Sequence, residues 1–206
     1  MTLSTLAILL GLGVAIPQVF ALSRPARFRE SARAFPRSES WGYGLMLLGT
    51  AWFLWNLKNE NISDFAAYKS MMLVGFALVG IGACIFLRDF LAVRGLAIVL
   101  LLLAKVMVDT ARWVDTSWRL VIVVWAYLLV VAGIWFTVSP WRMRDLVDWA
   151  TETDSRIRVM SAVRLAFGIF VLILGMTVFR QTDTTSRAQF APSPATASVP
   201  FDPTRL

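Results

Sequence analysis

Four charged residues in one apolar segment are the best candidates for chemistry in this sequence. Arg94, Lys105, Asp109 and Arg112 lie within residues 94–115. At 100° per residue, an α-helix places Lys105 about 20°, Asp109 about 60° and Arg112 about 0° round from Arg94. The four side chains therefore share one face, and Lys105 can pair with Asp109 one turn later. Lys105 would stand about 15 Å from either end of the segment, near the middle of a bilayer and facing the interior of a helix bundle.

Three roles are open for these residues. A charge at the bilayer centre costs on the order of 3 kcal/mol on insertion scales, so intramembrane charges are generally paired or functional. The pair Lys105 and Asp109 could fix the packing of helices. It could also form a path for protons, ions or a small anion, with Arg94 and Arg112 at the two mouths. Thirdly, the charged face could bind a helix of another subunit.

Other catalytic chemistry is excluded by what the sequence lacks. The chain has no histidine and a single cysteine, Cys84, so it offers no imidazole base, no disulfide and no usual zinc site. It contains no phosphate-binding loop and no nucleophile elbow. We therefore predict no catalytic residue, no metal and no cofactor, and a protein that is not an enzyme. An enzyme acting on lipid headgroups remains a third, weaker alternative.

The composition predicts a membrane protein. Of 206 residues, 58% are apolar and 16% are charged, and the mean hydropathy is +0.67. Soluble domains are about 45–50% apolar and about 25% charged. With this apolar content, the net charge of +7 indicates contact with a membrane surface and not with nucleic acid.

Six apolar stretches are long enough to cross a bilayer as helices. They lie near 3–22, 41–57, 71–87, 95–113, 120–138 and 159–179. We predict an all-α, polytopic membrane protein, a six-transmembrane-helix bundle over residues 1–180. Residues 181–206, rich in Pro, Ser, Thr and Ala, are expected to form a disordered tail. The first stretch could be a cleaved signal peptide, but no basic region precedes it, which favours a retained helix.

The distribution of Lys and Arg predicts the orientation. One set of connections carries eleven basic residues and the opposite set carries six. The positive-inside rule places the richer set in the cytoplasm and both termini outside it, with the reverse orientation as the alternative. The excess of Arg over Lys is typical of a GC-rich genome, so we expect the inner (plasma) membrane of a bacterium.

Two of these cytoplasmic connections have features of their own. The first carries five candidate contacts for anionic lipid headgroups, each adding about 1 kcal/mol near a charged surface: Arg24, Arg27, Arg29, Arg33 and Arg37. The same arginines could serve only to set the topology. The second, residues 139–158, predicts a short amphipathic helix in the membrane interface between helices 5 and 6, with Ser139 as N-cap and Pro140 next. Two pairs of opposite charge have i,i+4 spacing there: Arg144 with Asp148, and Glu152 with Arg156.

Small residues predict where helices approach each other closely. Ala7, Gly11 and Ala15 form a ribbon with a four-residue period in the first stretch, and Gly80 and Cys84 do the same in the third. Such ribbons let the backbones of two helices come into contact. They predict contacts between helices of the same bundle, with contacts between two copies of the chain as the alternative.

One part of the chain resembles a known group of proteins. It contains Val-Ser-Pro-Trp-Arg at 138–142, Asp-Ser-Arg-Ile-Arg at 154–158, and a last helix with Gly168 and Gly175. Residues 133–180 are similar in these features to small two-helix bacterial inner-membrane proteins of unknown function. The resemblance implies a helical hairpin in the inner membrane and no chemistry.

The sequence thus supports two functions. The first is a non-enzymatic accessory or assembly subunit of a membrane complex, with the lipid bilayer and another membrane protein or a second copy as partners. The alternative is a small channel or transporter for protons, ions or a small anion that uses the charged face around Lys105.

Overall fold

The structure, a computed structural model, describes residues 2–60, 67–114 and 116–181. This part of the chain is helical and contains no strand. Its α-helices are α1 (Leu3–Ser23), α2 (Pro25–Ala34), α3 (Glu39–Asn59), α4 (Lys69–Phe86), α5 (Leu91–Ala111), α6 (Arg119–Val138), α7 (Trp141–Ala150) and α8 (Asp154–Met176), with a 3-10 turn at Phe35–Arg37. The predicted all-α class is confirmed. Apart from Gln181, the predicted disordered tail lies outside the described residues.

Five helices are long and apolar enough to cross a membrane. They are α1, α4, α5, α6 and the stretch Asp154–Gln181, which contains α8. The sixth predicted span, 41–57, lies in a helix of 21 residues, α3. Glycine, tryptophan, tyrosine and asparagine lower the hydropathy of α3, because none of them is as apolar as the leucine and valine of the other long helices. Helix α3 is therefore long enough to cross a membrane, but its composition is less apolar than that of the other five helices.

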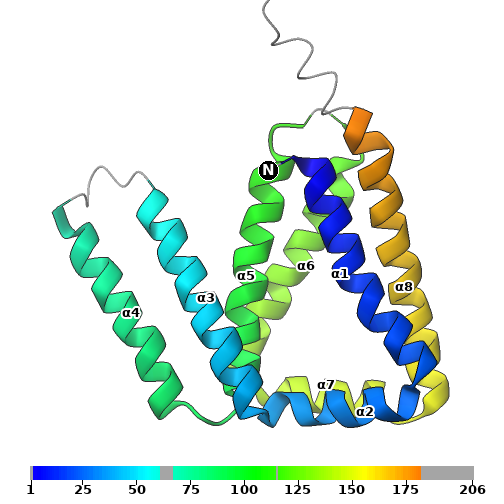
Figure 1. The fold of residues 1–206 in the computed structure, drawn as a ribbon, viewed down its shortest axis with the longest axis horizontal. Coiled ribbons are helices and arrows are strands. Elements are labelled where there is room, and N and C mark those ends of the chain that lie inside the picture. Colours follow the sequence, from blue (N-terminus) through cyan, green and yellow to red (C-terminus); the bar gives the residue numbers. More distant parts are fainter. Residues whose placement is uncertain (1, 61–66, 115, 182–206) are drawn as a thin grey trace, which may run out of the picture.

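The long helices form a row with two short helices across one end (Figure 1). Helices α1 and α8 lie side by side, α5 and α6 occupy the centre, and α3 separates α5 from α4. The end of the bundle where α1 begins and α5 ends is called the upper end here, as in Figure 1. The lower end carries α2 and α7. Helix α4 lies at the edge of the row, and α3 is its main neighbour.

Glycine makes the contact between α1 and α8 very close. A Cβ atom added to Gly11 would stand 2.7 Å from the carbonyl oxygen of Gly168, and one added to Gly175 would stand 3.1 Å from Cβ of Ala7. The Ser4 hydroxyl also donates a hydrogen bond of 2.8 Å to the carbonyl of Gly175. The predicted close approach at the ribbon of Ala7, Gly11 and Ala15 is therefore confirmed, with α8 as the partner.

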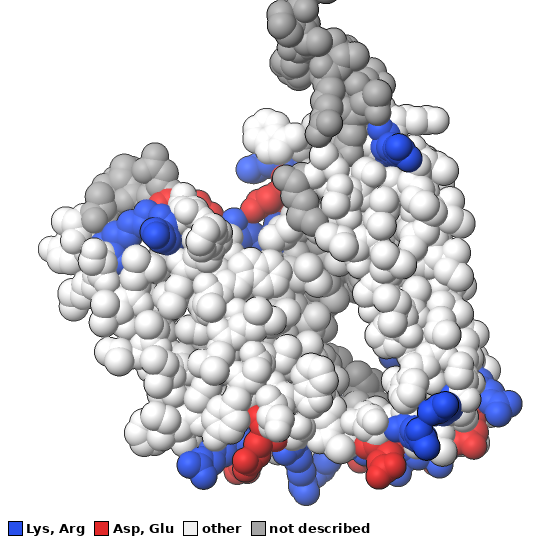
Figure 2. All heavy atoms as spheres, in the orientation of Figure 1, with Lys and Arg blue, Asp and Glu red and all other residues white. Residues whose placement is uncertain are grey.

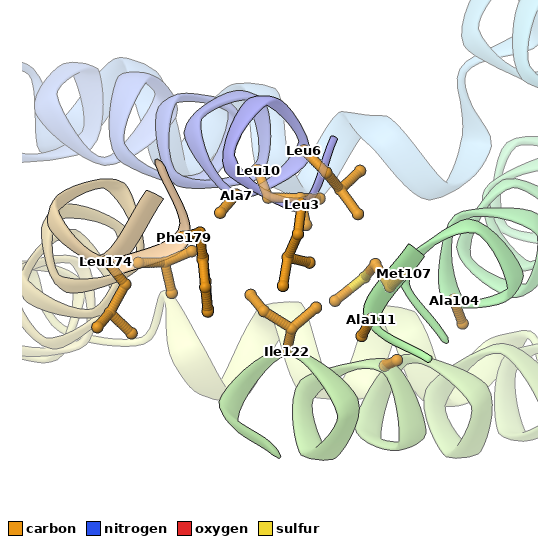
Figure 3. Close-up of a cluster of buried hydrophobic side chains, with 12 residues drawn as sticks. Leu3, Leu6, Ala7, Leu10, Ala104, Met107, Ala111, Ile122, Leu174 and Phe179 are labelled. Atoms are coloured by element: carbon orange, nitrogen blue, oxygen red, sulfur yellow. The ribbon is translucent and has the colours of Figure 1, made fainter. Parts of the chain in front are cut away.

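The main apolar core lies towards the upper end and joins α1, α5, α6, α8 and Phe179, which follows α8 (Figure 3). Leu3, Met107, Ile122 and Phe179 are fully buried in it. Below this core, α1 and α8 diverge from α5 and α6 towards the lower end (Figure 1). On this side the helices are thus close at the upper end and apart at the lower end, whereas α3 and α5 converge at the lower end.

Ion pairs join the two short helices at the lower end. Arg33 of α2 pairs with Asp148 of α7, with Nε 3.2 Å from Oδ1, and donates a hydrogen bond of 3.0 Å to the Thr151 hydroxyl. Arg29 pairs with Asp154 at the start of α8. Figure 2 shows the resulting band of mixed basic and acidic side chains along the lower end.

Of the two charge pairs predicted within residues 139–158, one forms and the other does not. Glu152 and Arg156 form the predicted pair. Arg144 instead pairs with its neighbour Asp145 at 3.2 Å, because Asp148 is turned towards α2 and bound by Arg33. The helix begins one residue later than predicted, since its N-cap residue is Pro140 and not Ser139.

Candidate functional site

The candidate site is a cluster of three charged residues at the upper end of α5. The Lys105 ammonium donates a hydrogen bond of 2.8 Å to Oδ2 of Asp109, so the predicted pair is confirmed. It also lies 3.1 Å from Oε1 of Glu60, which directly follows the last residue of α3. Two carboxylates and one ammonium give these three side chains a formal net charge of −1, and the Lys69 ammonium lies beside them, donating a hydrogen bond of 2.9 Å to the main-chain carbonyl of Glu60.

The structure corrects two expectations about the position of Lys105. Helix α5 ends at Ala111 and not near residue 115, so Lys105 stands six residues, or about 9 Å, from that end. Its ammonium reaches further up, to the end of α3. The side chains of Lys105, Glu60 and Asp109 are 43%, 53% and 55% exposed, so the cluster lies on the side of the bundle and not in its interior.

Arg94 and Arg112 do not join the cluster. Arg94 lies at the lower end of α5, about 16 Å along the helix from Lys105. Its Nε is buried and donates no hydrogen bond within the described part of the chain. Arg112 follows the last residue of α5 and is exposed, and its carbonyl accepts a hydrogen bond of 3.4 Å from Arg119. Arg94, Lys105 and Asp109 lie on one helix, α5, but the four charges do not form one group.

An apolar groove lies directly below the cluster. It has a volume of about 400 Å³ and is walled by α3, α4 and α5, with Lys105 on its rim. The rings of Phe53 and Phe76 meet edge to face across it, with centroids 5.0 Å apart. Apart from Lys105, Thr50 is the one lining residue with a polar side chain, and its hydroxyl donates to the carbonyl of Met46 at 2.8 Å. The groove thus combines an apolar surface with the charged cluster at one end.

Helix α4 approaches α3 very closely at one point beside the groove. A Cβ on Gly80 would stand 2.4 Å from Oγ1 of Thr50, which shows how closely the two helices touch there. Many large apolar side chains of α4 are nevertheless exposed: Met71, Val74, Leu78, Val79, Ile81, Ile85 and Phe86. The predicted packing role of Gly80 is confirmed.

The five candidate headgroup contacts fall into two groups. Arg29 and Arg33 are held by carboxylates of α8 and α7, as described above. Arg24, Arg27 and Arg37 are exposed and form no ion pair within the described residues. Only the second group has charges available for lipid, and its contact with anionic headgroups stays a prediction.

The sequence interpretation missed Glu60 and Thr50. Glu60 follows the predicted span 41–57 by three residues, and an acidic side chain at the end of one helix is a natural partner for a lysine on its neighbour. Its role was not apparent because the sequence does not tell that α3 packs against α5. In the described part of the chain, no group of three or more Asp, Glu or Cys residues has metal-binding geometry.

Comparison with known proteins gave no relative: no protein-family model, no curated protein and no solved structure matches this chain. The resemblance of residues 133–180 to two-helix inner-membrane proteins therefore stays a prediction. In the structure this stretch comprises the end of α6, all of α7 and α8. Rings of α6 and α8 meet at Trp125 and Phe167, with centroids 5.1 Å apart.

Proposed function

We propose that this protein is a non-enzymatic accessory or assembly subunit of a membrane complex, and that it binds one transmembrane helix of a partner protein in the groove between α3, α4 and α5. The observation that carries the proposal is the exposed cluster of Lys105, Glu60 and Asp109 above an apolar groove. The partner helix has an apolar face and a Lys or Arg near its upper end.

The free energy of burying charge is the reason for this proposal. A carboxylate or ammonium exposed to the hydrocarbon region is costly, and intramembrane charges are generally covered by protein. Here the Lys69 ammonium binds the main-chain carbonyl of Glu60, and the three side chains of the cluster carry a net charge of −1 on the surface of the bundle. A basic residue of the partner would balance this charge, while the groove provides van der Waals contact, the main attraction between helices in a membrane.

The proposal includes the arrangement of the chain in the membrane. Helix α3 is the sixth span, since it runs beside α4 and α5 over a similar length. The lower end, with its many arginines, faces the cytoplasm of a bacterium, and α1 begins outside. Helices α2 and α7 lie in the cytoplasmic interface, where Arg24, Arg27 and Arg37 contact anionic headgroups.

Transport of protons, ions or a small anion is the second candidate. The residues of α5 between Arg94 and Lys105 that line the groove are Ile98, Leu101 and Leu102, all apolar. A path for ions needs polar groups or water along its length. We therefore place helix binding before transport.

The test is the composition of the complex after gentle detergent extraction from native membranes. The wild type should co-purify with one membrane protein at fixed stoichiometry. Glu60→Gln makes the cluster neutral while keeping the Lys105–Asp109 pair, so it should lower the recovered partner at least tenfold. Glu30→Gln, an exposed acidic residue on α2, is the matched control and should retain the partner.

Two results would overturn the proposal. One is a chain that purifies alone, or a partner retained equally by Glu60→Gln. The other is ion or proton flux through the purified protein in proteoliposomes that Lys105→Met or Asp109→Asn abolishes without loss of folded protein. That second result would establish transport instead.

A further inference from the structure

We propose that a second cavity, between α1, α3, α5 and α6, binds one acyl chain of a membrane phospholipid. This inference is independent of the proposed function, because it rests on a different cavity on another face of α5. Leu103 and Val106, which line this cavity, lie about 180° and 120° round the helix from Arg94, whereas Lys105 lies within about 20° of it.

The cavity is large and its lining is apolar. Its volume is about 530 Å³, and leucine, valine, glycine and tryptophan are the residue types that line it. The only side-chain polar atoms among them are the indole nitrogens of Trp52 and Trp125. Buried water needs two to four polar partners, so this lining does not favour water. An empty space of this size forfeits packing contacts in proportion to its volume. An apolar occupant is therefore expected.

The depth of the cavity matches one leaflet of a bilayer. Its lining residues on α1 run from Leu6 to Val14, about 5 to 17 Å from the upper end of that helix. On α5 they run from Leu100 to Val106, about 8 to 17 Å from Ala111. One leaflet contributes about 15 Å of the hydrocarbon core. The cavity thus lies where the acyl chains of the upper leaflet lie.

The shape of the cavity suits a lipid chain. Its lining residues run along roughly 12 Å of α1, from Leu6 to Val14, and the other lining residues come from α3, α5 and α6. An extended hydrocarbon chain can therefore lie along α1 with apolar side chains of all four helices around it.

The cavity can be entered from the side. Gly13 lines it, and a Cβ atom there would meet nothing within 4 Å. Leu9, one turn earlier, is 54% exposed. Figure 2 shows the surface hollowed between the α1–α8 pair and the centre of the molecule, next to this part of α1. A chain from the surrounding leaflet can therefore enter between helices without unfolding any of them.

The test fills the cavity and counts bound lipid. Gly13→Leu places a side chain in the cavity, whereas Gly75→Leu places the same side chain on α4, where a Cβ also meets nothing within 4 Å. After extraction, the protein is exchanged with dioleoyl phosphatidylglycerol or dioleoyl phosphatidylethanolamine and weighed by native mass spectrometry. The wild type and Gly75→Leu should each retain one tightly bound phospholipid of either headgroup. Gly13→Leu should lower its occupancy at least tenfold.

A second variant, Val106→Phe, fills the cavity from α5 and should have the same effect, so the test does not depend on one substitution folding. Equal lipid occupancy in all variants would overturn the proposal. So would a wild type without bound phospholipid, or retention of phosphatidylglycerol alone, which would indicate a headgroup site elsewhere. These outcomes do not depend on whether Glu60→Gln releases a partner protein, so either proposal can fail without the other.

Discussion

The α1–α8 pair and the α3–α4 pair both contain glycines at the contact but pack differently. In the first pair, glycines on both helices lie opposite each other, and Gly11 and Gly168 bring the backbones into direct contact. In the second pair, a single glycine of α4, Gly80, touches Thr50 of α3. Gly75 and Gly82, on the same helix as Gly80, have no close neighbour on another helix.

The difference shows that glycines matched across the α1–α8 interface bring the two backbones together over a longer stretch than the single glycine between α3 and α4. Helix α8 offers Gly168 and Gly175 to the ribbon of α1, so the two helices stay close over most of their length. Helix α3 offers Thr50 to Gly80 at the closest point, and it offers the larger ring of Phe53 to Phe76 beside the groove. In the proposed function, the α1–α8 pair is the scaffold and the α3–α4 pair provides the surface for a partner.

The largest effect is expected where the two backbones touch. Gly11→Ala would place a Cβ atom 2.7 Å from the carbonyl oxygen of Gly168, so the helices must separate. Overpacking of this kind costs about 1–3 kcal/mol, and we expect a clear fall in the melting temperature in detergent. The control, Gly75→Ala, meets open space and should be neutral or stabilising by about 0.5–1 kcal/mol, because alanine favours a helix. Equal melting temperatures for the two variants would contradict the difference in packing between Gly11 and Gly75.

A smaller effect is expected between α3 and α4. Gly80→Ala would bring a Cβ atom to 2.4 Å from the Thr50 hydroxyl, a side chain that can move more readily than backbone. We expect a loss of about 1 kcal/mol, at the lower limit for overpacking. Thr50→Ala in the same chain should restore part of the loss, because it removes both atoms at 2.4 Å. Thermal unfolding of the two single variants and the double variant measures this coupling. If the free-energy changes of the two single variants simply add in the double variant, the loss in Gly80→Ala does not come from contact with Thr50.

The sequence predicted the individual helices of this fold better than it predicted which helices pack against each other. Hydropathy and small-residue spacing gave the long helices and the α1 ribbon, because both depend on one helix at a time. The pairing of Lys105 with Asp109 also followed, since it lies within one helix. Glu60 and the Arg33–Asp148 pair did not follow, because each joins residues far apart in the chain. The groove could not be predicted from the sequence either, because it depends on the distance between α4 and α5.

The most direct test of the helix-binding site is photo-crosslinking in native membranes. A benzophenone side chain replaces Phe76, which lines the groove, or Phe86, which is 84% exposed ten residues later on the same helix. Position 76 should give one protein adduct of defined mass, and Glu60→Gln should abolish it. Position 86 should give lipid adducts only. The same adducts from both positions, or an adduct at position 76 that Glu60→Gln leaves unchanged, would contradict the account.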